Sequence, residues 1–421
     1  MHSNHIIHEY FDKDFVVPIR DSLWHHIYLT SEFAELIKTK PFLQLHNIKQ
    51  LGPTYLVYPG ATHTRANHSL GVFHLAKQII ESLIIKPNCP ELNIYHVKAF
   101  LVAALLHDLG HFPYTHSFKE LPLVDHEILT GRIIMNSEIH QLLERIKIKP
   151  KDVVSIIDHH HPLPADSDFL LYRNILSGVL DPDKLDYLNR DAFYCGVPYG
   201  IQDIDHIFHN LRFHSSNGIS LTNKGIMSIE NILFSKYQMY KSVYWHPQVR
   251  IATALVKKAV YLGLENREIN PDNLYYKDDR EFHYMTRDLS APIQTLIQAS
   301  ENPGQYVIHE EMDFDSNNNL HQQLTQLDER HKCEQEIEQS IKDLLGTDVK
   351  NQIILDIPEN INFEVKFPIQ TSNSVIPFEN SESVFNKQNV HYFTSSLRKI
   401  RLLMPLNLSN AIGPEKSFLA R

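Results

Sequence analysis

Apolar residues recur every three or four positions through most of the chain between Ser31 and Leu264. This spacing matches the turn of an α-helix and places the apolar side chains on one face. Gly and Pro residues separate the apolar stretches, as is typical of short connections between packed helices. The pattern predicts helices in six stretches: residues 66–85, 97–110, 124–135, 139–146, 232–246 and 249–264.

The pattern changes after Glu265. Residues 272–303 remain partly helical, and residues 320–346 have the spacing of one amphipathic helix that Gly346 ends. Three later segments, separated by Asn-, Ser- and Pro-rich turns, have the composition of strands. These segments are residues 351–358, 362–369 and 391–396.

Length and composition indicate a globular protein with more than one unit. The chain has 421 residues, of which 43% are hydrophobic and 21% charged, so it can bury a sizeable core. We predict a mainly α fold, with a helical domain over residues 1–265 and a smaller mixed α/β region over residues 266–421. The formal net charge of −10 makes nucleic-acid binding unexpected. A metal ion with a few Lys or Arg side chains can still hold a small phosphorylated molecule in an acidic protein.

Cysteine usage and the N-terminal sequence bear on the cellular compartment. Cys89, Cys195 and Cys333 are odd in number and lack CxxC spacing, which indicates reduced thiols. The first 15 residues do not have the basic and then apolar segments of a signal peptide. Apolar runs such as "FLVAALL" are too short to span a membrane. We therefore expect a cytoplasmic protein without a membrane partner.

Candidate chemistry begins at the stretch Leu105–His116, "LLHDLGHFPYTH", where three histidines and an aspartate follow an apolar helix. His107 and Asp108 are adjacent, so they point about 100° apart around a helix and can flank one metal ion. Gly110 is expected to take the left-handed conformation that ends a helix. An isolated His-Asp pair is weak support for a metal site, because most such pairs are structural.

Two further segments strengthen the metal hypothesis. His68 lies early in the first predicted helix, after the turn "YPGATHT". In "DPDKLDYLNRD", Asp183, Tyr187, Arg190 and Asp191 fall on one helical face.

Two imidazoles and two carboxylates would form a mixed nitrogen and oxygen site. Such a site suits Mn, Fe, Ni, Zn or Mg and leaves coordination positions for water and phosphate. The alternative is that Asp183 and Asp191 only form ion pairs with Lys184 and Arg190 on a solvated face. The presence of His68 and the His107–Asp108 pair favours the metal site.

His68, the His107–Asp108 pair and Asp183, in that order, match the H…HD…D signature of the HD-domain metal-dependent phosphohydrolases. From about residue 48 to residue 249 the chain resembles the deoxynucleoside-triphosphate (dNTP) triphosphohydrolase branch of that family. The motifs that carry this resemblance are "IKQLG" (48–52), "YPGATHTRANHSLGV" (58–72), "HDLGHFPYTHSF" (107–118), "DHE" (125–127) and "DKLDYLNRD" (183–191).

The resemblance implies that residues 1–265 form an HD phosphohydrolase domain. It also implies hydrolysis of a dNTP to deoxynucleoside and tripolyphosphate, and a homo-oligomer, dimeric or tetrameric, to which residues 266–421 contribute. One divalent metal ion would be bound by His68, His107, Asp108 and Asp183. The proton-transfer histidines beside the metal would be His111, His116 and His126, with His116 as the acid for the 5′-oxygen. The positions that match contacts to the triphosphate or the nucleoside are Gln50, Leu51, Arg65, Lys184, Tyr187, Asp191, Lys236, Tyr240 and Tyr244.

The chain departs from the family pattern at two places. An acidic residue is common where this chain has Lys119, and Glu120 follows one position later. A family site for a guanine-nucleotide activator uses Asp, Gln and Arg where this chain has Lys38, Leu43 and His46. We therefore do not expect an activator to bind in that way.

Two other functions remain open from the sequence. The first is another HD phosphohydrolase activity, on a nucleotide monophosphate or on a cyclic or alarmone nucleotide. The second is nucleotide sensing without catalysis, which Lys119 favours. The segments "QLG" and "DKLDYLNRD" favour dNTP hydrolysis, because they supply the groups that would face the sugar and the triphosphate.

Overall fold

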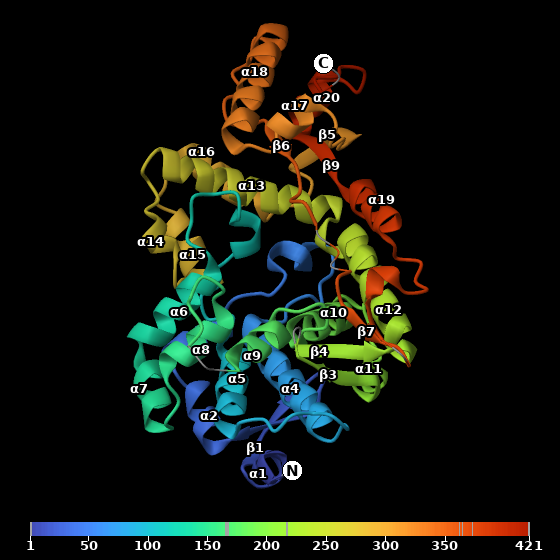
Figure 1. Cartoon of the computed structure of the whole chain (residues 1–421). Helices are drawn as coiled ribbons and strands as arrows, with labels where there is room; N and C mark the ends of the chain where they lie inside the picture. The colour runs from blue at the N-terminus through green and yellow to red at the C-terminus, as the bar shows by residue number, and fades with distance from the viewer. Residues whose placement is uncertain are drawn as a thin grey trace.

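The computed structural model of the protein describes residues 2–164, 168–215, 218–361, 363, 365–372 and 374–419. It confirms a mainly α fold with a smaller mixed α/β region (Figure 1). The helices before residue 266 are α1 (His2–Lys13), α2 (Ser31–Leu36), α3 (Lys40–Leu45), α4 (Arg65–Ile84), α5 (Ile94–Leu106), α6 (His126–Asn136), α7 (Glu138–Arg145), α8 (Pro150–Ile157), α9 (Phe169–Leu176), α10 (Pro182–Cys195), α11 (Ile204–Asn210), α12 (Ile226–Met239) and α13 (Pro247–Glu265).

The helix α5 lies at the centre of the first hydrophobic core. Asn93 caps it, since the Asn93 side chain accepts a hydrogen bond from the backbone N–H of Tyr95. Val97 and every residue from Ala99 to Leu106 are buried, so the helix is apolar on all sides and is surrounded by other helices. Its C-terminal end therefore brings the next residue, His107, into the interior of the protein.

Two antiparallel hairpins lie in the helical region. The strands β1 (Phe15–Asp21) and β2 (His25–Thr30) pair before α2. The strands β3 (Leu211–His214) and β4 (Gly218–Thr222) pair between the fourth and fifth predicted helical stretches, where no strand was predicted. Their strands are only 4 to 7 residues long, which leaves few positions to define an alternating pattern.

The region after Glu265 contains two further sets of strands. The strand β9 (Lys399–Pro405) lies between β5 (Tyr306–Asp313) and β6 (Ile354–Asp356), antiparallel to both. The strands β7 (Pro368–Gln370) and β8 (Val375–Pro377) extend the sheet of β3 and β4. The helices are α14 (Pro271–Leu274), α15 (Asp279–Thr286), α16 (Ala291–Ser300), α17 (Asn319–Gln323), α18 (Leu327–Leu345), α19 (Lys387–Leu397) and α20 (Leu406–Ile412).

The amphipathic stretch at residues 320–346 is two helices, α17 and α18, and not the single helix predicted. Gly346 ends α18 in the left-handed conformation, with φ of 67°, as the sequence predicts. The break between the helices is filled by Arg330, whose guanidinium donates to the carbonyls of Leu324 and Thr325.

The three strand predictions had different outcomes. Residues 351–358 contain β6, which confirms the first. In the second, residues 362 and 364 lie outside the described residues, and only its last positions belong to β7. The third was wrong, because residues 391–396 lie in α19. Asn386 caps that helix, and Phe393 packs against Tyr237 with ring centroids 4.9 Å apart, so capping and packing outweigh local strand propensity.

The chain after Glu265 returns to the helical region. β7 pairs in parallel with β4, where Ile369 lies opposite Leu221. Ile369 and Phe367 are buried in the same hydrophobic core as α4, α5 and α10. In Figure 1, α13 separates the helical region from α18 and the sheet of β5, β6 and β9. Residues before and after Glu265 therefore pack into a common hydrophobic core.

Among the described residues, no helix combines the length and the apolar character needed to cross a lipid bilayer.

We predict that Ile369→Ala lowers the free energy of unfolding by about 2–5 kcal/mol, because it leaves a cavity in the helical core. Denaturant titration followed by tryptophan fluorescence will detect this loss, since Trp24 and Trp245 both precede residue 266. The control is Val375→Ala on β8, where the side chain is 49% exposed and a change within about 0.5 kcal/mol is expected. An unchanged fluorescence transition in Ile369→Ala would mean that the returning segment does not support the helical region.

Candidate active site

A cleft of about 700 Å³ lies between α13 and the helices that precede it. Four residues from the region after Glu265 also line it: Ile357, Glu359, Asn360 and Ile361. Every residue that the sequence indicated for the site lines this cleft: Gln50, Leu51, Arg65, His68, His107, Asp108, His111, His116, His126, Asp183, Lys184, Tyr187, Asp191, Lys236, Tyr240 and Tyr244.

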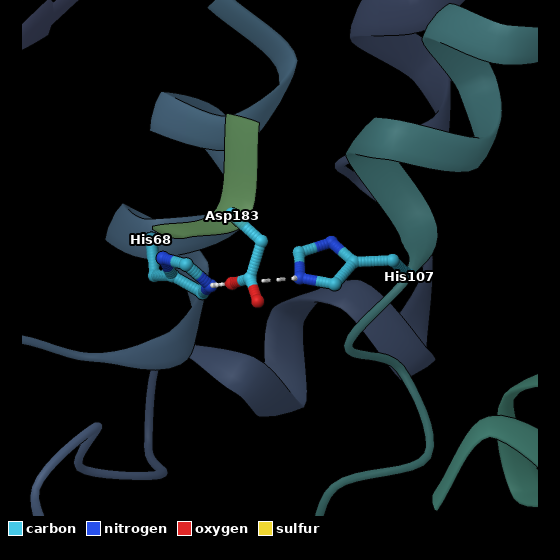
Figure 2. Close-up of side chains that lie close together, drawn as sticks. All are labelled: His68, His107 and Asp183. Carbon is cyan, nitrogen blue, oxygen red and sulfur yellow. Dashed lines mark ion pairs between the residues drawn. The ribbon is translucent and has the colours of Figure 1, made fainter. Parts of the chain in front are cut away.

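Three side chains from three helices converge at the base of the cleft (Figure 2). His68 comes from the first turn of α4, His107 follows the last residue of α5, and Asp183 lies in the first turn of α10. The Nε2 atoms of His68 and His107 lie 2.8 Å and 3.9 Å from the same oxygen of Asp183. One ligand atom from each residue lies within 4.8 Å of the others, which is close enough for one metal ion.

Asp108 lies next to this group. Its carboxylate oxygens lie 3.3 Å from Nε2 of His107 and 3.9 Å from Nε2 of His68. The carboxylate also accepts a hydrogen bond of 2.8 Å from the guanidinium of Arg65. Three of the four residues for which the sequence indicated metal binding thus form one group, and Asp108 lies beside it in an ion pair with Arg65.

The hydrogen bonds of the two histidines fit a metal ion. Nδ1 of His68 lies 2.8 Å from a carboxylate oxygen of Asp186, and Nδ1 of His107 lies 2.9 Å from the carbonyl of Ala104. Each Nδ1 is therefore engaged by an acceptor outside the group, and each Nε2 faces the carboxylates, where a metal ion would take the place of its proton. Nε2 of His107 is buried and forms no hydrogen bond with any residue that the structure describes. Two imidazole nitrogens with two carboxylates are a donor set for a divalent ion.

The charges of the side chains around the site favour the binding of a cation. Burial alone would lower the pKa of His68, but its contacts with Asp183 and Asp186 outweigh burial and raise the pKa to about 10. Burial would raise the pKa of Asp108, but the neighbouring His111, His107 and Arg65 lower it well below its usual range. Burial would also raise the pKa of Asp183, but the hydrogen bond and charge of His68 lower it, so both carboxylates are held in the charged form that a cation requires.

Asp186 holds the His68 ring in place through a hydrogen bond, and the sequence analysis did not identify this residue. Its carboxylate accepts from Trp24 Nε1 at 2.5 Å and from two nitrogens of Arg190 at 2.8 Å and 2.9 Å. Arg190 also donates to Asp21, so it points into the core and not into the cleft that Asp183 lines. The prediction of one shared face was wrong for Arg190. The i, i+4 spacing of Asp186 and Arg190 is the signal that could have identified this pair.

Two glycines in the motifs permit close approach between helices. A Cβ at Gly71 would lie 1.8 Å from the Asp186 carboxylate, and a Cβ at Gly110 would lie 2.1 Å from the carbonyl oxygen of His126. Gly110 does not have the positive φ that was predicted. Its role is to let α6 pack against the segment after His107, which brings His126 to the site.

The three remaining histidines form a cluster beside the metal group. Nδ1 of His111 lies 3.1 Å from Asp108, and its Nε2 lies 3.3 Å from Nε2 of His116. The ring of His126 lies tilted against that of His111, with centroids 4.1 Å apart and an angle of 52° between the ring planes.

Their environments differ in exposure. His111 is buried, and burial with the charge of Arg65 lowers its pKa well below the usual range. Dehydration within the cleft, with the charges of Arg65, His111 and Lys119, also lowers the pKa of His116. The His116 ring is open to the cleft, however, so water screens part of this effect.

The opposite end of the cleft is polar and fixed by hydrogen bonds. The two oxygens of the buried Asp191 carboxylate engage Nε2 of His63 at 2.8 Å and the hydroxyl of Tyr244 at 2.6 Å. His63 was missed by sequence reasoning, although it lies in the motif "YPGATHT". The carbonyl oxygen of the Gln50 side chain is buried and accepts no hydrogen bond within the described part of the chain.

Sequence comparisons match two consecutive families. Residues 65–191 match the HD domain, and residues 202–391 match the HD associated region. The uncharacterized protein YwfO of Bacillus subtilis is 35% identical over 250 residues, which cover 58% of this chain and 54% of YwfO. Human deoxynucleoside triphosphate triphosphohydrolase SAMHD1 is 32% identical over 216 residues, which cover 44% of this chain and 34% of SAMHD1. The match thus spans about half the length of YwfO and about a third of SAMHD1.

The fold is similar to that of solved structures over nearly its whole length. A hypothetical protein from Aquifex aeolicus superposes with a TM-score of 0.70 at 25% sequence identity, over 94% of this chain and 98% of that chain. The HD match contains all four residues of the metal group, and the associated region contains α13 and β7. The chain therefore belongs to the HD-domain phosphohydrolase family, in the branch that includes the deoxynucleoside triphosphate triphosphohydrolases.

Proposed function

We propose that this protein hydrolyses dNTPs to deoxynucleoside and tripolyphosphate. The observation that carries the proposal is the composition of one cleft. It combines a metal donor set, a histidine cluster, several cationic side chains and a fixed carboxylate at the far end. A phosphate ester with a hydroxylated sugar is the class of molecule that needs all four groups.

His68, His107, Asp108 and Asp183 would hold one divalent ion. When bound, such an ion polarises a phosphoryl oxygen and stabilises the negative charge that develops there. The donor set suits Mn, Fe, Ni, Zn or Mg, so the identity of the ion follows from its availability and the coordination geometry.

The cationic side chains would bind the triphosphate. Arg65 is held at the base of the cleft by its ion pair with Asp108. Lys184 is held by Asp181 and by the carbonyl of Gly178, at 2.6 Å and 2.9 Å. Lys236 lies over the ring of Phe363, with Nζ 5.4 Å from the centroid. These contacts fix the cations before a substrate binds, which reduces the entropy cost of binding.

Asp191 would bind the 3′-hydroxyl of the sugar. His63 and Tyr244 each engage one of its oxygens, so the carboxylate cannot rotate away from the cleft. Each carboxylate oxygen has a second lone pair, and the sugar hydroxyl can donate to it. Gln50 and Tyr187 also line the cleft and would contact the deoxyribose.

The reaction breaks the bond between the α-phosphorus and the 5′-oxygen, and water supplies the new oxygen on phosphorus. The 5′-oxygen then needs a proton, and we assign its transfer to His116. His111 and His126 support that ring, because they surround it within the cluster. The negative charge of a bound triphosphate would raise the pKa of His116 and so allow it to carry the proton.

The prediction for the metal group is that the His107→Ala, Asp108→Ala double variant releases no tripolyphosphate. The wild-type protein, incubated with each dNTP and Mn²⁺ or Mg²⁺, will release tripolyphosphate, and EDTA will stop the reaction. Ion-exchange chromatography separates tripolyphosphate from pyrophosphate and phosphate. The control is His160→Ala, an exposed histidine outside the cleft, which will retain wild-type activity.

Other products would change the assignment. Release of phosphate or pyrophosphate in place of tripolyphosphate would favour another HD phosphohydrolase activity. Binding of a metal ion and a nucleotide without any product would favour a sensing role.

The prediction for Lys119 concerns the pH dependence of kcat. His116 must be protonated to act as an acid, so kcat falls as the pH rises through the pKa of His116 in the substrate complex. Lys119→Glu replaces a nearby positive charge with a negative one, which raises that pKa and moves the falling limb to higher pH. The matched control is Lys151→Glu, the same change at an exposed position outside the cleft. If both variants keep the wild-type profile, His116 is not the acid.

A further inference from the structure

The segment between α5 and α6 that carries His111 and His116, residues 111–121, is here named the histidine loop. Three of its apolar side chains, Phe112, Phe118 and Leu121, are at most 5% exposed. They belong to the second hydrophobic core, which is formed mainly by α13 and residues after it. The histidine loop therefore leaves the core of α5 and packs on a different part of the protein.

Aromatic contacts confirm where the histidine loop packs. The ring of Phe112 lies edge-on to that of Tyr275, with centroids 5.5 Å apart. The ring of Tyr114 lies 5.6 Å from that of Phe282. Tyr275 and Phe282 both belong to the region after Glu265, so this region supports one wall of the cleft.

Glu120 fixes the end of the histidine loop by ion pairs. Its carboxylate accepts from Lys257 Nζ at 2.6 Å and from two nitrogens of Arg330 at 2.9 Å and 3.0 Å. Arg330 is 2% exposed and comes from α18. A planar guanidinium that forms two parallel hydrogen bonds with a carboxylate fixes its orientation as well as its distance. These three residues are named the Glu120 cluster.

Glu120 and Lys119 face different surroundings. Lys119 lines the cleft, whereas Glu120 does not. The carboxylate that follows Lys119 is thus directed to α13 and α18 and is not available to His116. Although burial opposes it, the charges of Lys257 and Arg330 lower the pKa of Glu120 to about 2, so the cluster stays charged across the neutral range.

The helix α18 is itself held in place at the next turn. Glu334 is buried, pairs with Lys258 of α13 and accepts a hydrogen bond of 2.8 Å from the backbone N–H of Leu355 in β6. Arg330 is therefore presented to Glu120 from a helix that is fixed to both α13 and the sheet.

We propose that Arg330, acting through Glu120, is a positioning residue for His116. The proposal rests on the proposed function in one respect, namely that His116 transfers a proton in the reaction. Arg330 lies more than 200 positions after His116 in the sequence, in a part of the chain that contributes no metal ligand. Its effect is on the orientation of the histidine loop, so its loss reduces the rate of the chemical step and leaves binding of metal and substrate nearly unchanged.

The experiment compares Arg330→Met and Arg330→Lys with Lys332→Met in the full-length protein. Lys332 lies on the same helix in an exposed ion pair with Glu329, so its variant controls for loss of a cation from α18. We expect kcat for dNTP hydrolysis to fall about 10- to 100-fold in Arg330→Met, with KM and Mn²⁺ affinity within about twofold of wild type. Arg330→Lys will recover part of the loss, because lysine keeps the charge but cannot form the paired hydrogen bonds.

Hydrogen exchange provides a readout that does not depend on activity. The amides of Thr115, Ser117 and Leu121 are hydrogen-bonded within the histidine loop, so they report its order. We expect faster exchange at residues 112–121 in Arg330→Met, and unchanged exchange in α4 and α10. Exchange can be faster in Arg330→Met although the wild-type protein releases no tripolyphosphate. In that case, the Glu120 cluster positions the histidine loop and the proposed function is wrong.

Wild-type behaviour of the histidine loop in Arg330→Met would contradict the proposal. If Arg330→Met has a lower Tm but wild-type kcat and wild-type exchange in the histidine loop, Arg330 only stabilises the fold and the proposal is wrong. If Arg330→Met does not fold, Arg330→Lys carries the same test. In that case, wild-type kcat and exchange in Arg330→Lys would overturn the proposal.

Discussion

The candidate metal site depends on the buried carboxylate of Asp186. Its two oxygens accept hydrogen bonds from Trp24 in the N-terminal hairpin, from His68 in α4 and from Arg190 in α10. A buried carboxylate is stable only with such partners, and removing one member of a buried ion pair costs roughly 3–5 kcal/mol in other proteins. The same hydrogen bond sets the tautomer of His68 and directs its other nitrogen at Asp183. Fold stability and ligand geometry therefore depend on one group.

The helix α13 has a comparable role for the other wall of the cleft. Its N-terminal part lines the cleft through Arg250 and Thr253, and its remaining length is the centre of the second hydrophobic core. Arg250 pairs with the buried Asp356 of β6, so the sheet of the region after Glu265 is tied to the cleft by charge as well as by apolar packing. The cleft is thus formed between two cores, and each core supplies different chemistry. The first carries the residues that we propose as metal ligands, and the second supports the histidine loop.

Several local expectations failed because packing outweighed local preference. Residues 391–396 have strand composition but lie in α19, since Asn386 caps the helix and Phe393 packs on Tyr237. Gly110 was expected to end a helix by its backbone conformation. It is required because any side chain there would collide with α6. In both cases the deciding contact comes from a residue outside the short window that sequence pattern analysis can use.

The sequence by itself determined six helical stretches before residue 265 and indicated a set of residues that all line one cleft. Amphipathic spacing fixes which face of a helix is buried, and His68, the His107–Asp108 pair and Asp183 each lie at a helix end that the pattern marks. Only the tertiary structure decided which groups support that site. The partners of Asp186, His63 and Glu120 include residues from more than 100 to more than 200 positions away, and no local period records such a pairing. Burial of charge is what selects these partners, because a buried carboxylate must find a donor wherever the fold brings one.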